Sequence, residues 1–492
     1  MASLIIRIGK TFRIRRPLAP LSQPGCVPKT NVQGYAPGNK MEASKREAQQ
    51  GQQFAFAWRS EAYAWAVVAL LIVAFMFAMI DRMILTLLVA PLKTDFNLSD
   101  TQISLLHGLA FTMLYVIVGI PMGWLTDRFS RRLVACVSVA AWSVMTALCG
   151  ISGNFIQLFL ARMGVGIGEA GISPAANSMI PDYFPPSRAS LPITLYSIGG
   201  SVGSGLALIF GGTVVDHVSR LGRISIPLVG EIHGWQASFL VAGFPGLLVA
   251  AAFLFVKEPP RHGKQTAGGI AAVPISATIR LFKEKSSFLL PQFCASAACA
   301  LVILSTLAWM PTYLIRAYGY TAGEAGLRYG LVVLVGGISG LIISGSVANR
   351  LAAAGRRDAS IIVALGFTVL AIIPSVVAPI VRHSGITLLM GGITVFGYAA
   401  AIALAPVALP IVIPNEMRGQ IYALYLLTIS VLGYAVGPVI VALITDKIFQ
   451  NDAMVGWSMA IVALVVGPLA GLLWVLSRKQ FLKLIGNELT GP

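Results

Sequence analysis

Charged residues are scarce in this sequence. Asp, Glu, Lys and Arg together make up 11% of the 492 residues, whereas a typical soluble domain has about 25%. Hydrophobic residues make up 56%, and no soluble fold could cover that much apolar surface with so few charges. The composition therefore excludes a disordered protein and a soluble enzyme. It indicates a polytopic helical membrane protein with room for about a dozen spans of about 20 residues each.

Cysteine and histidine are also few, with five of each. Neither residue type occurs at the spacing of a metal site, so we predict no metal, no cofactor and no disulfide. Four cysteines lie within apolar runs, where this residue behaves as a small hydrophobic side chain: Cys136, Cys149, Cys294 and Cys299. The sequence offers no nucleophile with a placed base, and we therefore do not expect an enzyme.

Positive charge exceeds negative charge, with 36 Lys and Arg residues against 19 Asp and Glu. The basic residues lie in the termini and in short loops rather than in a stripe with exposed aromatics, so we exclude nucleic-acid binding. Loops after the even-numbered apolar runs carry more Lys and Arg than the loops on the opposite side. The positive-inside rule therefore predicts an even number of spans with both termini in the cytoplasm.

Twelve apolar runs separated by polar segments predict twelve spanning helices. The expected helices are 62–92, 100–126, 131–152, 155–182, 188–215, 235–256, 286–317, 322–349, 358–381, 385–412, 417–445 and 454–477. We divide the chain into a basic, disordered cytoplasmic tail, an N-terminal six-helix bundle, a cytoplasmic linker, a C-terminal six-helix bundle and a second cytoplasmic tail: 1–60, 61–256, 257–285, 286–480 and 481–492.

The linker between the two predicted bundles has its own pattern. Its second half places Ile275, Ile279 and Phe282 on one helical face. This arrangement favours an amphipathic helix on the membrane surface, and a flexible linker is the alternative.

Two loops of the chain repeat one another. The loop after the second run has Gly123, then Asp127-Arg128 and Arg131-Arg132, and the loop after the eighth run has Gly345, then Asn349-Arg350 and Arg356-Arg357. In both loops Gly precedes the Asp or Asn by four residues, and both loops follow the second helix of a six-helix half. The repeat indicates duplication and two pseudo-symmetric bundles, as in many secondary transporters.

Four ionisable residues lie inside predicted spans: Asp81 and Arg82 in the first, and Arg162 and Glu169 in the fourth. Such residues are functional candidates, because each costs roughly 2.5–3.5 kcal/mol on insertion scales. The two spans run in opposite directions, which brings Asp81 and Arg162 to compatible depths. Glu169 lies seven residues from Arg162, on nearly the same helical face. We predict that Asp81, Glu169 and Arg162 form a proton-coupling network, and a static ion pair is the alternative.

The C-terminal bundle instead offers hydroxyl and aromatic side chains within its spans: Ser305, Thr306, Trp309, Tyr313, Tyr398, Tyr422, Tyr425, Thr428 and Tyr434. One wall of a central cavity would then be charged and the other apolar and aromatic, which suits an amphiphile. We predict that its polar head contacts Arg82, Arg162 and Glu169. We expect its tail to lie against Trp309, Tyr313 and Tyr425. Packing or interfacial anchoring is the alternative for any single tyrosine.

The loop from Gly123 to Arg132 resembles the signature loop of the major facilitator superfamily, Gly-x-Leu-x-Asp-Arg-x-x-Arg-Arg. The resemblance implies an all-α fold of twelve helices in two bundles that open alternately to the two sides of the membrane. Asp127 is then expected near the start of span 11, whose positive helix end favours a carboxylate. Together with Gly123, the arginines Arg128, Arg131 and Arg132 would complete a cytoplasmic gate by pairing with acids of the N-terminal bundle.

Asp81-Arg82, the segment from Arg162 to Ala170, and Val202-Gly-Ser-Gly205 resemble the Spinster branch of this superfamily. The resemblance implies a proton-coupled carrier of a lysophospholipid or a sphingoid-type lipid. The segment from Gly171 to Asn177 is also similar to the organic-anion symporter branch, so a symporter of small organic anions such as sugar acids is the alternative. We expect a monomer in the cell inner membrane whose partners are the lipid bilayer, protons and this substrate.

Overall fold

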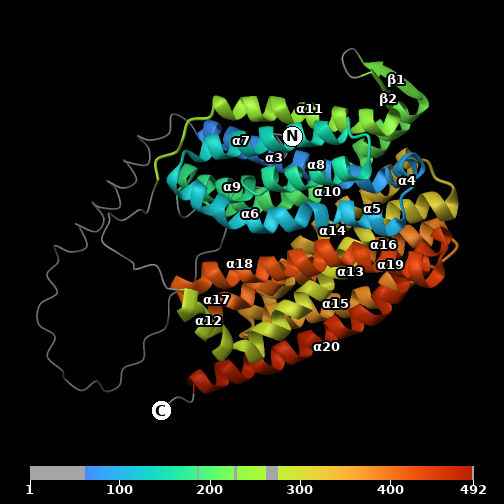
Figure 1. The fold of residues 1–492 in the computed structure, drawn as a ribbon. Coiled ribbons are helices and arrows are strands. Elements are labelled where there is room, and N and C mark those ends of the chain that lie inside the picture. Colours follow the sequence, from blue (N-terminus) through green and yellow to red (C-terminus); the bar gives the residue numbers. More distant parts are fainter. Residues whose placement is uncertain (1–60, 186–187, 227–229, 262–274, 490–492) are drawn as a thin grey trace, which may run out of the picture. The chain divides into compact units, whose positions relative to one another are not determined.

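The computed structural model describes residues 61–185, 188–226, 230–261 and 275–489. Twelve helices in this part of the chain are long and apolar enough to cross a membrane, which confirms the predicted all-α, twelve-span fold (Figure 1). The predicted tail 1–60, the first part of the linker and residues 490–492 lie outside the described residues.

The N-terminal half contains spans 1 to 6. Spans 2 and 4 are interrupted at glycines, Gly108 and Gly171, and a short antiparallel hairpin precedes the last span. In order, the elements are α3 (Glu61–Leu87), α4 (Val89–Phe96), α5 (Asp100–His107), α6 (Leu109–Arg128), α7 (Arg131–Cys149), α8 (Phe155–Glu169), α9 (Ile172–Tyr183), α10 (Ser190–Arg220), β1 (Arg223–Ile226), β2 (Gly230–His233) and α11 (Gly234–Leu254). Span 2 comprises α5 and α6, and span 4 comprises α8 and α9.

The C-terminal half contains spans 7 to 12, and the short helix α12 precedes it. The elements are α12 (Ile275–Glu284), α13 (Ser286–Tyr318), α14 (Ala322–Ala353), α15 (Ala359–Val377), α16 (Ser384–Leu404), η1 (Ala405–Ala408), α17 (Leu409–Val412), η2 (Asn415–Met417), α18 (Arg418–Ile429), η3 (Ser430–Val436), α19 (Gly437–Leu443), η4 (Ile444–Phe449), η5 (Asp452–Met454) and α20 (Val455–Leu489). Span 11 contains two π-helical stretches, η3 and η4.

Local signals in the sequence account for the boundaries of these helices. Thr321 accepts a hydrogen bond from the backbone N–H of Glu324, and the Glu324 side chain accepts one from the backbone N–H of Thr321, which starts α14 as a capping box. Gly319 ends α13 in the left-handed conformation, with φ of 67°, which costs glycine little because it has no Cβ.

Two features of the fold differ from the expectations. The hairpin was not predicted, and Arg223 of β1 pairs with His233 of β2. Helix α20 continues to Leu489, beyond the expected helix 454–477 and into the segment expected as a tail, whose cytoplasmic location stays a prediction. The helix continues because Phe481 is buried against Phe288, with ring centroids 5.3 Å apart.

The linker forms a helix in its described second part. Helix α12 covers residues 275–284, as the amphipathic pattern predicts, and packs against α13 and α18. Phe282 contacts Phe293 with ring centroids 6.0 Å apart, whereas Ile279 is exposed. Its position at the membrane surface stays a prediction.

The two halves meet most extensively where α10 of span 5 packs along α14 of span 8. We name the two ends of the bundles by what lies there. The hairpin end carries β1, β2, α4 and the start of α5, and the linker end carries α12, α17 and the end of α6 (Figure 1).

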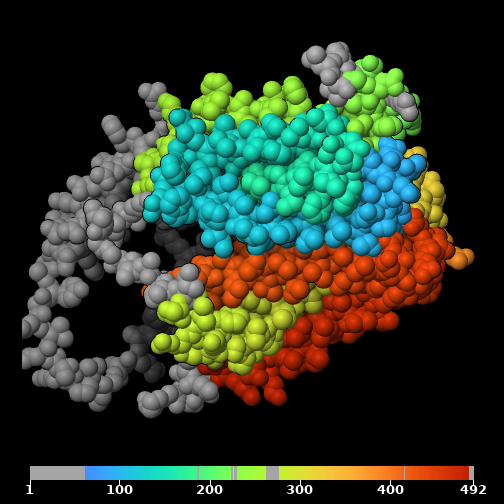
Figure 2. All heavy atoms as spheres, viewed as in Figure 1, coloured from blue at the N-terminus to red at the C-terminus, as the bar shows by residue number. Residues whose placement is uncertain are grey.

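Contact between the halves is close at the hairpin end and is lost toward the linker end. A Cβ placed on Gly212 would lie 2.6 Å from the carbonyl oxygen of Ala322, and one on Gly205 would lie 2.9 Å from that of Gly330. Farther along the same seam, a Cβ on Gly337 would be 3.4 Å from Ser201. The halves therefore separate toward the linker end, while Figure 2 shows them in contact toward the hairpin end.

Candidate functional site

The first buried ion pair joins span 1 to span 4. Arg162 Nη1 lies 2.9 Å from Asp81 Oδ2, and both residues are buried. The hydroxyl of Thr146 on α7 donates to the other carboxylate oxygen of Asp81 at 2.6 Å. The predicted pairing of Asp81 with Arg162 is confirmed, and it ties three helices of the N-terminal half together.

A second buried pair, which was not predicted, lies beside the first. Arg82 Nη2 is 2.5 Å from Glu169 Oε2, and Arg82 Nε donates to the same oxygen at 2.8 Å. The other oxygen of Glu169 has no hydrogen-bond partner among the described residues. Consecutive residues of α3 therefore pair with residues seven apart on α8, which lie on nearly the same face of that helix.

Aromatic rings surround the Arg82 guanidinium. Its Cζ lies 4.3 Å from the ring centroid of Phe111, 5.2 Å from that of Tyr115 and 5.8 Å from that of Tyr434. Phe111 and Tyr115 belong to α6 of the N-terminal half, whereas Tyr434 belongs to η3 of the C-terminal half. Cation–π attraction thus places Arg82 in contact with both halves.

A cavity of about 370 Å³ lies between the halves and reaches Arg82. Four serines from α9 and α10 form one wall: Ser173, Ser197, Ser201 and Ser204. Leu426, Ile429, Ser430 and Tyr434 of span 11 form the opposite wall. The lining of the N-terminal half therefore carries a charge, on Arg82, besides hydroxyl groups and aromatic rings, whereas the lining of the C-terminal half is uncharged.

A smaller cavity of about 30 Å³ lies on the other side of Arg82 and is lined by Thr86, His107 and Tyr434 among others. Nε2 of His107 is buried without a hydrogen-bond partner in the described structure. A cavity of this volume holds about one water molecule.

Three residues predicted to bind substrate do not line either cavity. Trp309 donates to the carbonyl of Pro438 at 3.0 Å, Tyr313 to that of Val381 at 3.4 Å, and Tyr425 to that of Ile402 at 3.2 Å. All three side chains are buried. In the conformation described, Trp309, Tyr313 and Tyr425 pack inside the C-terminal half, and their predicted contact with the substrate stays a prediction.

The predicted gate arginines are held within the N-terminal half. Arg131 forms an ion pair with Asp182 of α9, and its Nε lies 2.8 Å from Glu258 Oε1. The backbone N–H of Arg132 donates to Glu258 at 3.0 Å. The expected pairing with acids of the N-terminal half is confirmed for Arg131 through Asp182, and for Arg128 and Arg132 it stays a prediction. Burial raises the pKa of Glu258, but hydrogen bonds from Arg131, Arg132 and Ser130 outweigh it and hold the pKa below its ordinary value.

The other gate residues lie at the open linker end. A Cβ on Gly123 would meet nothing within 4 Å. The Asp127 carbonyl accepts a hydrogen bond from Arg261, and Arg128 lies over the ring of Trp124 with its Cζ 4.3 Å from the centroid. Their predicted role is to close the linker end in a conformation other than the one described. This role stays a prediction.

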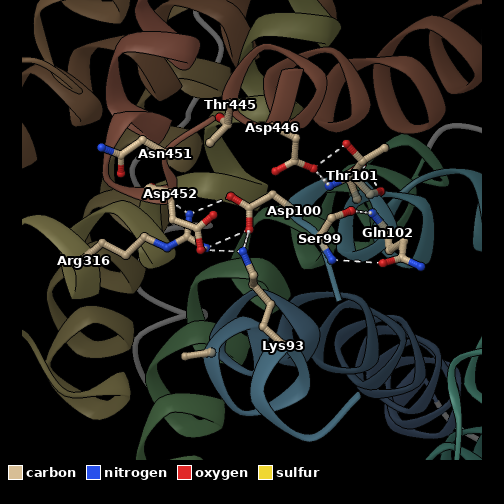
Figure 3. Close-up of polar contacts among 12 residues, drawn as sticks. Lys93, Ser99, Asp100, Thr101, Gln102, Arg316, Thr445, Asp446, Asn451 and Asp452 are labelled. Carbon is tan, nitrogen blue, oxygen red and sulfur yellow. Dashed lines mark hydrogen bonds and ion pairs between the residues drawn. The ribbon is translucent and has the colours of Figure 1, made fainter. Parts of the chain in front are cut away.

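A network that was not predicted joins the halves at the hairpin end, where Figure 3 shows it. Arg316 of α13 donates to both oxygens of Asp100 at 2.7 and 2.8 Å. Lys93 of α4 lies 2.8 Å from Asp100 and 2.5 Å from Asp452. Thr101 donates to Asp446 through its backbone N–H at 2.7 Å and its hydroxyl at 2.6 Å. Asp100 is fully buried, so this network closes the hairpin end.

Among the described residues, Asp100, Asp446 and Asp452 could bring ligand atoms within 4.8 Å of one another. Lys93 and Arg316 already provide positive charge beside them. These ion pairs account for Asp100 and Asp452, while Asp446 accepts hydrogen bonds from Thr101.

Two six-helix halves around a cavity with buried charges are the architecture of a secondary transporter rather than an enzyme. The sequence model of the Major Facilitator Superfamily matches residues 70–438. The chain belongs to this family.

Several characterised proteins are similar to the chain. An MFS-type efflux pump of Mycolicibacterium smegmatis is 28% identical over 79% of this chain and 86% of its own length. Protein spinster homolog 1 of Homo sapiens is 27% identical over 75% of this chain and 71% of its own length. A hexuronate transporter of Bacillus subtilis is 26% identical over 51% of this chain and 57% of its own.

The fold is also similar to a solved structure. A bacterial homologue of the human lysosomal transporter Spinster, in an inward-facing and unoccupied conformation, superposes with a TM-score of 0.72. It is 25% identical, and the similarity covers 86% of this chain and 99% of that one. The chain is thus a Spinster-like member of the superfamily.

Proposed function

We propose that the protein is a proton-coupled transporter that moves an anionic amphiphile, a lysophospholipid or a sphingoid-type phosphate, by alternating access. The observation that carries the proposal is the buried Arg82–Glu169 pair at the cavity between the halves. Burying charged side chains within membrane spans costs free energy, which makes this pair a candidate for a functional role.

Coupling to protons follows from the connectivity of this pair. When Glu169 accepts a proton, Arg82 loses its charged partner in the N-terminal half and keeps its rings, including Tyr434 of the C-terminal half. Arg82 is then free to bind a substrate anion. Proton binding and substrate binding therefore bias the same contact between the halves, and such a shared bias is what couples two ligands.

The substrate class is supported by the asymmetry of the cavity walls. An anionic head group fits beside Arg82 and the serine hydroxyls, and an acyl chain fits against Leu426 and Ile429. The similarity to a Spinster homologue supports the same substrate class, because the resemblance to the Spinster branch implies a lysophospholipid or sphingoid-type lipid.

A second candidate, a sugar acid, is favoured by one specific observation. The four cavity serines provide hydroxyl groups along one wall, which could bind the hydroxyl groups of a sugar acid while Arg82 binds its carboxylate. The similarity to a hexuronate transporter supports this candidate.

The proposal also includes the orientation of the protein in the membrane, its conformation and its oligomeric state. The linker end carries the basic loops, so we place it and both termini in the cytoplasm of a cell with the protein in its inner membrane. The conformation described is then inward-facing. Each chain holds a complete cavity between its own halves, and we propose that it works as a monomer.

The test uses the full chain in proteoliposomes with a panel of lysophospholipids, sphingoid phosphates and sugar acids. Glu169→Gln should abolish accumulation driven by a pH gradient but preserve exchange of substrate across the membrane, because only the proton-accepting group is removed. Glu284→Gln, an exposed glutamate of α12, is the matched control and should behave as the wild type. Gradient-driven accumulation that survives Glu169→Gln would refute coupling through this residue.

A further inference from the structure

The repeated loop of the C-terminal half borders a second cavity, which the transport cycle proposed above does not involve. Its residues Asn349, Arg356 and Arg357 line a cavity of about 520 Å³ at the linker end. The cavity is enclosed by the ends of spans 8, 9, 10 and 12 and is separate from the one that reaches Arg82.

The polar side of this cavity has an excess of positive charge. Asp358 is buried and is shared by Arg478, whose Nε is 2.6 Å away, and Arg356, whose Nε is 3.3 Å away. Arg357 has no acidic partner among the described residues. Burial raises the pKa of Asp358, but hydrogen bonds from the two arginines outweigh it and lower the pKa. Arg356 and Arg357 are thus the charged residues that line the cavity, and Asp358 behind them is shared with Arg478 and balances only part of their charge.

The start of span 9 adds to this polarity. Ala359 and Ser360, in the first turn of α15, line the cavity. The Asp358 side chain does not cap this helix, because it is turned toward Arg356 and Arg478. The first turn thus leaves amide donors, and the helix dipole also favours a negative charge there.

The remaining wall of the cavity is apolar. Val407 and Ile411 at the end of span 10 are 52% and 50% exposed, and Ile485 of α20 lies on the same cavity. A free phosphate would leave these side chains uncovered. A molecule with a phosphate at one end and a hydrocarbon chain at the other covers both walls, and the bilayer around the spans supplies such molecules.

We propose that this cavity binds an anionic phospholipid, with its phosphate at Arg356 and Arg357 and one acyl chain along Val407 and Ile411. The lipid joins the loop between spans 8 and 9 to the end of span 10 and to the extended part of α20. Zwitterionic phospholipids bind less well, because their second charge is positive and meets the arginines.

The experiment measures binding of phosphatidylglycerol and phosphatidylcholine to the purified full chain by native mass spectrometry. The wild type should retain phosphatidylglycerol in a saturable manner and prefer it to phosphatidylcholine. Arg357→Gln should weaken phosphatidylglycerol binding about fivefold, since one basic residue near an anionic lipid contributes about that much.

A second variant, Val407→Trp, keeps every charge but fills the apolar wall, and it should also remove saturable binding. The matched control Arg280→Gln removes an exposed arginine of α12 that does not line the cavity, and it should bind as the wild type. Equal binding of both lipids, wild-type binding by both test variants, or an equal loss in the control would overturn the proposal. Competition by inorganic phosphate alone would also overturn it, because the site would then take phosphate without lipid.

Discussion

The two ends of the bundles carry ion-pair networks that are built alike but connected differently. At the hairpin end, Asp100 of the N-terminal half pairs with Arg316 of the C-terminal half, and the Thr321 hydroxyl donates to Asp216 across the seam at 2.7 Å. At the linker end, Arg131 pairs with Asp182 and Glu258 of its own half. We expect the first network to determine which end is closed, and the second to stabilise one bundle internally.

The difference teaches that the position of a charge in the fold, rather than its type, decides its effect. Breaking a pair between halves should alter the population of the two openings. Breaking a pair within one half should alter the stability of that half and leave the openings unchanged. Four substitutions, taken from the largest expected effect to the smallest, test this distinction.

Arg131→Ala should have the largest effect on stability. It leaves Asp182 and Glu258 without their shared cation, and loss of one partner from a buried pair costs about 3 kcal/mol or more. Thermal unfolding in detergent measures this loss. Arg128→Ala, at the same end but stacked on exposed Trp124, should cost less than about 1 kcal/mol. Spin-label distances across the hairpin end should be unchanged in both variants, and a change would contradict the assignment of Arg131 to its own half.

Asp100→Asn should shift the protein toward the conformation that is open at the hairpin end. The amide cannot neutralise Lys93 and Arg316, and hydrogen bonds between charged groups contribute about 2 kcal/mol, so the ratio of the two openings should change roughly thirtyfold. Distances between spin labels on the hairpin and on η5 measure the shift. Asp95→Asn is the control, because Asp95 lies at the same end but binds Trp235 and His233 of its own half. An equal shift in both variants would refute the role of Asp100.

Two glycines of span 2 should respond differently to alanine. A Cβ on Gly108 collides with the carbonyl oxygen of Tyr434 in the other half, whereas a Cβ on Gly123 meets nothing. Gly108→Ala should therefore destabilise the closed hairpin end by about 1–3 kcal/mol, and Gly123→Ala should leave this conformation within about 0.5 kcal/mol of the wild type. The same spin-label distances provide the measurement, and an equal response would show that the linker end is closed as well.

Glu258→Gln should have the smallest effect, and it depends on pH. The folded-state pKa of Glu258 is lowered, so its contribution to stability is present above the ordinary glutamate pKa of about 4.3 and is lost as pH falls through the lowered value. The melting temperature of the variant should lie below that of the wild type at neutral pH. The two should converge in acid, and a constant difference down to the most acidic pH measured would contradict the assignment.

The spans could be predicted from the sequence because each is a long apolar run bounded by polar residues. The end of α20 could not be predicted in this way. Lys483 lies between Phe481 and Ile485, so this segment has the pattern of an amphipathic helix rather than of an apolar run. Hydropathy detects burial in lipid, but these two side chains are buried against protein. The hairpin was missed because its strands have four residues each, too short for alternation to be distinguished from a loop.

The charged half of the candidate site could be predicted in part. The opposite directions of spans 1 and 4 determine that Asp81 and Arg162 share a depth. The pairing of Arg82 with Glu169 depends on the rotation of α3 and α8 about their axes, which the sequence does not specify. The same limit explains Trp309, since its place in span 7 was correct but the face of α13 that meets the cavity was not known.

The seam between α10 and α14 has a mechanical consequence. Gly205 and Gly330 touch through their backbones, each beside the carbonyl oxygen of the other. Leu334 and Ile209 pack beside this contact, but the two glycines have no side-chain rotamers to rearrange, so the helices could tilt about the point where they touch. A larger side chain at either glycine would hold α10 and α14 apart in both conformations. It would therefore slow the change between the two openings in both directions.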